Sequence, residues 1–192
     1  MWVTKRVFIL TSVLLLISNV AFSQAGVYKT YKDYLNNNLT NYGRYSSVYH
    51  FLGRFTVSFE NERGKKTDIK IRKGNIWGYK NNNGDVYRVD EKNYPRKITS
   101  FGKIVVYGNY TEKGYSIVTK RDPQTGFSST SSTPYLFSFG TNGDMELLSK
   151  NNLRRALKKR KDKMGLELLK KVSVFKGYLV MDFIRDYNEA NK

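Results

Sequence analysis

The chain has 192 residues, with 34 Lys and Arg against 16 Asp and Glu, one histidine and no cysteine. The absence of cysteine excludes disulfides, cysteine nucleophiles, zinc–thiolate sites and iron–sulfur clusters. A formal net charge of +18 attracts anions such as nucleic acid, anionic lipid and acidic polysaccharide, but it does not define a fold.

The N-terminus has the pattern of a secretory signal peptide. Lys5 and Arg6 precede the apolar run VFILTSVLLLISNVAF, and Ala21 and Ser23 are small residues at the spacing of a signal-peptidase site. We therefore expect residues 1–23 to be removed and the chain to be exported to the periplasm, the outer envelope surface or the medium. The apolar run is shorter than the roughly 20 residues of a spanning helix, which favours a signal peptide over an anchor. After its removal no transmembrane span is expected. An uncleaved membrane anchor is the alternative.

Residues 24–192 are long enough to form a single globular domain that is stabilised by burial alone. Its first predicted element is a short helix over residues 31–37. Thr30 and Asp33 have the spacing of a capping box. Residues with helical spacing follow at Tyr31, Tyr34 and Leu35.

A β-rich region is predicted from residue 44 to residue 148. Short runs of β-branched and aromatic residues alternate there with turn segments such as NERGKK and NNNGD, which is typical of consecutive antiparallel hairpins. We expect a β-meander, either an open sheet or a partly closed barrel, with a polar hairpin loop over residues 122–134. The predicted strands contain FTVSF, DIKIR, IWGYK, DVYRV, KIVVYGNY, YSIVTK and YLFSF.

The stretch IWGYKNNNGDVYRV is predicted to be one of these hairpins, because asparagine and glycine tolerate the positive backbone angles of a tight turn. Strand alternation places Trp77 and Tyr79 on one face, with Tyr87 on the paired strand. These three aromatic residues are expected to be sheet or core residues, and stacking on a ligand is the alternative.

Residues 149–192 are predicted to be helical, which makes the fold class α+β, with two or three C-terminal helices. MELLS is a candidate last strand before them. Gly165 and Gly177 are expected to separate the helical segments. Three polar residues are candidate caps of the first helix: Ser149, Asn151 and Asn152. The apolar positions at helical spacing are Leu153, Ala156, Leu157, Leu166, Leu169, Val172, Leu179, Phe183 and Ile184.

The strongest charge cluster is LRRALKKRKDK, in which seven basic residues and one acid lie between Arg154 and Lys163. We take Arg154, Arg155, Lys158 and Lys159 as candidate contacts to an anionic lipid or polysaccharide of the envelope. The alternative is a solvated helix face whose few apolar residues pack on the sheet. Export disfavours nucleic acid as the partner.

No catalytic residue, metal site or cofactor is predicted. His50 stands between two aromatic residues and is expected to pack against its neighbours. A zinc site is not expected, because with a single histidine its other ligands would all have to be carboxylates. Asp182 and Asp186 are expected on a solvated helix face, with Arg185 between them. A pair of acids that meets only in space, as in glycosidases, leaves no sequence motif.

Four segments resemble, in order, those of a group of small exported bacterial proteins of unknown function: AFSQ at the end of the signal, GVYKTYKDYLNNN, IWGYKNNNGDVYRV and NNLRRAL. The resemblance covers most of the mature chain and depends on aromatic and turn residues. It implies export and a location in a Gram-negative envelope or outside the cell. It transfers no catalytic or binding residue to this chain.

These observations support three hypotheses. The first is a non-enzymatic binding or structural protein of the cell envelope or extracellular space, whose partner is an anionic envelope component or another protein. The second is a carboxylate-dependent hydrolase of envelope polymers, which requires two acids converging in a cleft. The third is a small barrel that binds a hydrophobic ligand, which requires a closed sheet with an unfilled interior.

Overall fold

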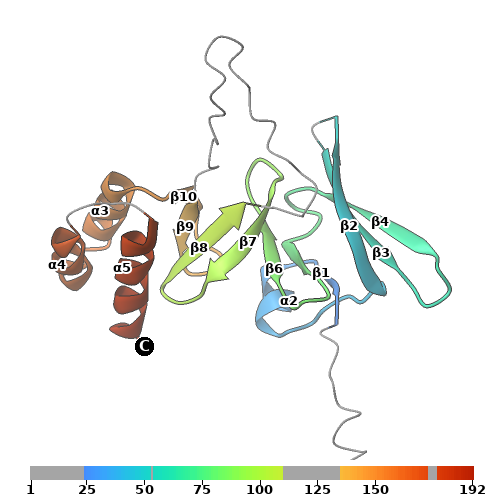
Figure 1. Cartoon of the computed structure of the whole chain (residues 1–192), viewed down its shortest axis with the longest axis horizontal. Coiled ribbons are helices and arrows are strands. Elements are labelled where there is room, and N and C mark those ends of the chain that lie inside the picture. The colour runs from blue at the N-terminus through green and yellow to red at the C-terminus, as the bar shows by residue number, and fades with distance from the viewer. Residues whose placement is uncertain (1–23, 53, 110–134, 173–176) are drawn as a thin grey trace, which may run out of the picture.

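The computed structural model describes residues 24–52, 54–109, 135–172 and 177–192 (Figure 1). The predicted signal peptide, the YSIVTK strand and the polar loop at 122–134 lie outside the described residues. The described elements are β1 (Gly26–Tyr28), α2 (Tyr31–Leu35), β2 (Arg44–Phe51), β3 (Arg54–Glu60), β4 (Lys66–Ile71), β5 (Gly78–Lys80), β6 (Val86–Val89), β7 (Pro95–Ser100), β8 (Ile104–Asn109), β9 (Leu136–Phe139), β10 (Glu146–Leu147), α3 (Lys150–Lys159), α4 (Lys163–Lys171) and α5 (Gly177–Glu189).

Two open antiparallel sheets form the β-rich part of this α+β fold. The larger sheet has the strand order β1-β5-β6-β7-β8-β9-β10, and the smaller one has the order β2-β3-β4. From β5 to β10 each strand pairs with the next, which confirms the predicted meander. Neither sheet closes within the described residues, so the open-sheet prediction is confirmed and no barrel forms there. The large sheet lies between the C-terminal helices at one end and the small sheet at the other (Figure 1).

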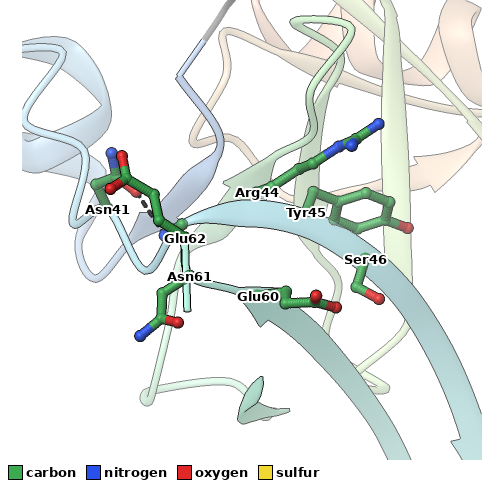
Figure 2. Close-up of a pocket in the computed structure, with 8 residues that line it drawn as sticks. Asn41, Arg44, Tyr45, Ser46, Glu60, Asn61 and Glu62 are labelled. Atoms are coloured by element: carbon green, nitrogen blue, oxygen red, sulfur yellow. Dashed lines mark hydrogen bonds between the residues drawn. The ribbon is translucent and has the colours of Figure 1, made fainter. Parts of the chain in front are cut away.

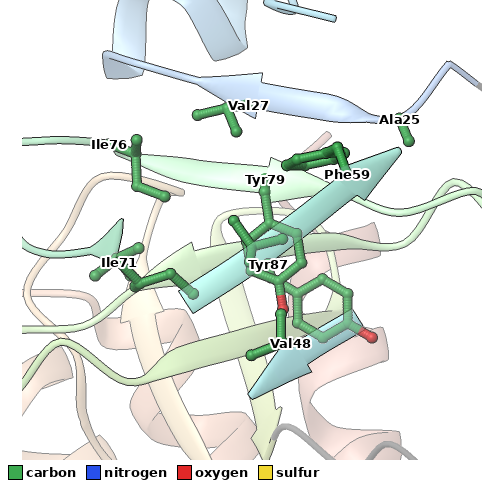
Figure 3. Close-up of a cluster of buried hydrophobic side chains, with 10 residues drawn as sticks. Ala25, Val27, Val48, Phe59, Ile71, Ile76, Tyr79 and Tyr87 are labelled. Atoms are coloured by element: carbon green, nitrogen blue, oxygen red, sulfur yellow. The ribbon is translucent and has the colours of Figure 1, made fainter. Parts of the chain in front are cut away.

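The small sheet packs on the part of the large sheet that contains β1, β5 and β6. Val48 and Phe59 of the small sheet belong to one buried cluster with Tyr79 and Tyr87 of the large sheet (Figure 3). Tyr79 and Tyr87 stand opposite each other in the strand register, and their rings stack with centroids 4.7 Å apart. Burial of this kind stabilises the fold by about 1.5–3 kcal/mol for each fully buried large apolar side chain.

Strand β8 is buried on both faces. Ile104 and Val106 belong to a cluster with Phe183 of α5. Val105 and Tyr107 belong to the cluster on the opposite face, beneath α2. The continuous apolar run IVVY is therefore what a strand covered by two layers requires.

Asn188 ties the C-terminal helix α5 to β8. Its side-chain Oδ1 accepts from the Ile104 N–H at 2.8 Å, and its Nδ2 donates to the Ile104 carbonyl at 2.8 Å. The buried amide thus acts as a strand partner for the backbone of Ile104, although the two residues are 84 positions apart.

The NNNGD segment forms the predicted turn between β5 and β6. The Asn81 side-chain oxygen accepts from the N–H groups of Asn83 and Asp85, and Gly84 has a φ of 84°. Asn82 has a second role, because its side-chain amide donates to the Tyr45 carbonyl and accepts from the Tyr45 N–H. The turn therefore also connects the large sheet to β2 of the small sheet.

Trp77 does not share a face with Tyr79, which corrects the predicted alternation. Ile76 and Tyr79 belong to the cluster beneath the small sheet, whereas Trp77 belongs to the cluster beneath α2. The physical reason is that β5 begins only at Gly78, so Trp77 lies in a bend where strand alternation does not apply. Gly78 is required there because a Cβ would lie 2.2 Å from the Tyr87 carbonyl oxygen.

The helix caps follow the sequence prediction. Thr30 and Asp33 form a complete capping box on α2, and Ser149 caps α3. Gly165 does not interrupt a helix, which corrects that prediction. The break comes earlier, at Lys161 with a φ of 56°, and Gly165 lies inside α4. Its missing side chain makes room for neighbouring α3 and α5, since a Cβ would lie 2.7 Å from atoms of both Leu157 and Tyr187.

Candidate functional site

The three aromatic residues considered as ligand contacts are core residues. Trp77 is 9% exposed, Tyr87 6% and Tyr79 0%. Trp77 stacks on Tyr34 of α2 with ring centroids 4.3 Å apart, and its Nε1 donates to Asn142. At this burial the three rings belong to the core and leave little surface for a ligand.

The cationic face of α3 is exposed. Arg154, Arg155, Lys158 and Lys159 all lie on the solvent side of this helix. The opposite side is buried through Leu153 and Leu157, which belong to the cluster with β8 and β9. The sequence placed these residues correctly because helical periodicity separates the two apolar positions from the basic ones.

Few acids compensate this cationic face. Arg155 pairs with Glu146 at 2.8 Å, whereas Arg154, Lys158 and Lys159 form no ion pair with any described residue. The guanidinium of Arg160 lies 4.2 Å from the ring centroid of Phe139, where it makes a cation–π contact. The face therefore presents uncompensated positive charge on a helix that the core holds in place.

Asp162 is the only acid in the LRRALKKRKDK segment, and it forms hydrogen bonds with α4 and α5. It caps α4 by accepting from the Gly165 N–H at 2.8 Å, and it accepts from the Tyr187 hydroxyl at 2.5 Å. Burial disfavours its charged form, but the hydrogen bonds from Tyr187 and Gly165 and the charge of Lys103 outweigh burial, so the pKa of Asp162 is lowered. Burial and the same hydrogen bond raise the pKa of Tyr187 above its usual value.

A pocket of about 720 Å³ lies beside the start of β2 and the turn after β3 (Figure 2). Glu60 extends toward Ser46, whereas Glu62 lies toward Asn41 (Figure 2). Two carboxylates thus share one pocket, but the lining is polar and most of it is exposed, so it offers no apolar setting for a general acid. The lining residues are Asn41, Gly43, Arg44, Tyr45, Ser46, Glu60, Asn61 and Glu62.

His50 and the two aspartates of α5 contact neighbouring side chains. His50 stacks on Phe55 with ring centroids 4.3 Å apart, which agrees with the packing role predicted for it. Arg185 contacts both Asp182 and Asp186, at 2.9 and 3.3 Å, as expected for a solvated helix face. Within the described ranges no group of three or more His, Asp or Glu side chains is arranged to hold a metal ion.

One exposed feature was not singled out by the sequence analysis. Phe51 and Leu52 stand at the β2–β3 connection with most of their side-chain surface in solvent. The available signal was FLGR, in which two apolar residues adjoin a glycine at a position where the strand pattern calls for a polar turn.

The described part of the chain is an α+β protein with two open antiparallel sheets, a cationic helix at one end and an apolar hairpin connection in the small sheet. Comparisons with models of known families, with curated proteins and with solved structures find no match to the chain. None of the helices in the described ranges has the length and apolar character needed to cross a bilayer. Function is therefore inferred from the residues themselves.

Proposed function

We propose that this protein is exported and acts without catalysis, by binding an anionic component of the cell envelope through the cationic face of α3. The observation that carries the proposal is the set of exposed, largely uncompensated cations on a helix fixed by Leu153 and Leu157. Each such charge near an anionic surface contributes about 1 kcal/mol. The signal-peptide pattern and the resemblance to small exported proteins support an envelope or extracellular location.

The test is co-sedimentation of the exported chain, residues 24–192, with isolated Gram-negative envelopes at increasing salt. The variant combines Arg154→Ser, Lys158→Ser and Lys159→Ser. The matched control removes three exposed cations elsewhere through Lys29→Ser, Arg63→Ser and Lys65→Ser. We expect the α3 variant to lose about tenfold or more in affinity at low salt and the control to lose much less. Equal losses in both variants would show that net charge alone matters and would contradict the proposal.

A carboxylate-dependent hydrolase is the second candidate because Glu60 and Glu62 line one pocket, although that pocket gives neither acid an apolar setting. The test measures release of soluble fragments from purified envelope polymers by the unmodified chain and by the Glu60→Gln and Glu62→Gln variants. Turnover that either substitution abolishes would replace the binding proposal with this one.

A further inference from the structure

The β2–β3 connection exposes apolar side chains that the core does not use. Phe51 is 68% exposed and Leu52 is 82% exposed. Tyr49 on β2 and Tyr94, before β7, are also exposed for such large side chains. We call Phe51 and Leu52 the hairpin tip. Isolated exposed apolar residues are common on protein surfaces, so exposure alone does not indicate a function for the tip.

The backbone of the tip provides one such observation. Phe51 pairs with Arg54 in the strand register, so Leu52 lies just beyond the last paired residue of β2. Leu52 has a φ of 48°, in the left-handed region that glycine, asparagine and aspartate usually occupy. A bulky residue at such a position is a rare conformation that burial does not explain here. Neither packing in the core nor the usual residue preference of the turn accounts for a leucine at this position.

The tip is supported from below by an aromatic stack. His50 stacks on Phe55, and Phe55 contacts Tyr94 with ring centroids 5.0 Å apart. Val48 and Val57 continue this packing into the buried cluster between the sheets. The hairpin that carries the tip is therefore held by contacts with Tyr94 and with the buried cluster.

Three cations without acidic partners among the described residues lie on or just after the strands that adjoin the tip. Arg54 lies opposite Phe51, and the pairing of Phe55 with Ile71 brings Arg72 beside Arg54. Together with Lys70, these exposed residues form no ion pair with any described residue. The nearby acid Asp68 accepts hydrogen bonds from the hydroxyls of Tyr49 and Ser58.

We propose that the hairpin tip inserts into the interfacial region of an anionic phospholipid bilayer. Phe51 and Leu52 enter the boundary between headgroups and acyl chains, where apolar side chains leave water. Tyr49 and Tyr94 lie at headgroup depth, which amphipathic aromatic rings prefer. The cations Arg54, Lys70 and Arg72 then meet lipid phosphates.

The size and the charge of this surface favour a bilayer over a protein. Two projecting side chains cover far less than the roughly 800 Å² that each partner contributes to a stable protein interface. A bilayer needs no matching concave surface, and its anionic headgroups complement the three cations. The proposal goes beyond the proposed function because it adds a contact that does not involve α3.

The test measures binding of residues 24–192 to vesicles of phosphatidylcholine, with and without an equal share of phosphatidylglycerol. Leu52→Trp places a fluorophore at the tip, and the remaining Trp77 is buried in the core. We expect its emission to shift to the blue only with phosphatidylglycerol present, and brominated lipids to quench it. Emission that stays unchanged on vesicle binding would overturn the proposal.

A second arm compares Phe51→Ser/Leu52→Ser with the control Leu35→Ser, which also removes an exposed leucine. We expect the tip variant to bind phosphatidylglycerol vesicles about tenfold more weakly or worse, and the control to bind normally. Leu52→Gly should weaken binding without lowering the thermal midpoint, since glycine accepts the positive φ. Equal binding by all variants, or a tip-dependent dimer in solution, would overturn the proposal.

Discussion

Asn82 connects the two sheets through one side chain. Its amide donates to the Tyr45 carbonyl at 2.8 Å and accepts from the Tyr45 N–H at 2.9 Å. We expect Asn82→Ala to lower the free energy of unfolding by about 1–3 kcal/mol, because two backbone groups of Tyr45 lose their partner. Urea denaturation measures the change. Asn83→Ala in the same turn is the control and should stay within about 0.5 kcal/mol of the unmodified protein.

Asp162 makes stability depend on pH in the acid range. Its pKa in the folded protein is lowered, so between the usual aspartate value of about 4 and this lower value the unfolded chain binds the extra proton. The stabilisation is therefore complete above about pH 4 and is lost as pH falls through the folded-state pKa.

We expect Asp162→Asn to flatten this acid-side decline in the free energy of unfolding. The measurement is a series of urea titrations between about pH 2 and pH 7. Asp144→Asn, at an exposed aspartate, should keep the slope of the unmodified protein. An unchanged slope in Asp162→Asn would mean that other groups determine the acid sensitivity.

At the scale of elements, Gly165 determines how closely α3, α4 and α5 pack. Alanine would be favoured by helix propensity by about 1 kcal/mol, but its Cβ would lie 2.7 Å from Leu157 and Tyr187, which are both fully buried. The cost of this clash should exceed the gain in helix propensity. We therefore expect Gly165→Ala to destabilise the protein by about 1–3 kcal/mol in thermal or urea unfolding. A stabilised variant would show that the helices separate easily. Glu167→Ala, on the exposed side of α4, is the control.

Elements were predictable wherever the signal was local. The capping box at Thr30 and the cap at Ser149 depend on residues within one turn, and the turn chemistry of NNNGD is equally local. Strands β1, β2 and β7 were not singled out. The sequence signal of β1 is weak because this strand has only three residues, and its partner β5 lies far along the chain. The signal of β7 is weak because this strand begins with a proline. Trp77 was given the wrong face because the sequence does not show where β5 begins.

The proposed contact surfaces were predictable only in part. Helical spacing identified the cationic face of α3, because charge and apolar positions alternate with the helix period. The hairpin tip was missed because exposure depends on where β2 and β3 pair. The pocket beside Glu60 was missed because its residues come from two separate segments.

At the scale of the whole molecule, the cationic helix and the small sheet lie at opposite ends (Figure 1). Binding to phosphatidylglycerol vesicles should therefore separate into two parts, measured between about 50 and 500 mM salt. We expect Arg154→Ser/Lys158→Ser/Lys159→Ser to reduce the salt dependence, and Phe51→Ser/Leu52→Ser to lower affinity at every salt concentration. Because the sites are far apart, the effects on free energy should add in the combined variant. If the tip variant only reduced the salt dependence of vesicle binding, the apolar side chains of the tip would make no contribution to affinity.

The link between Asn188 and Ile104 joins residues 84 positions apart. A ribosome makes the N-terminal end first, so the face of β8 that α5 covers remains exposed to water until α5 has been made. Completion of this half of the molecule therefore waits for α5. In the proposed export through a translocation channel, such a delay keeps the chain unfolded and competent for passage.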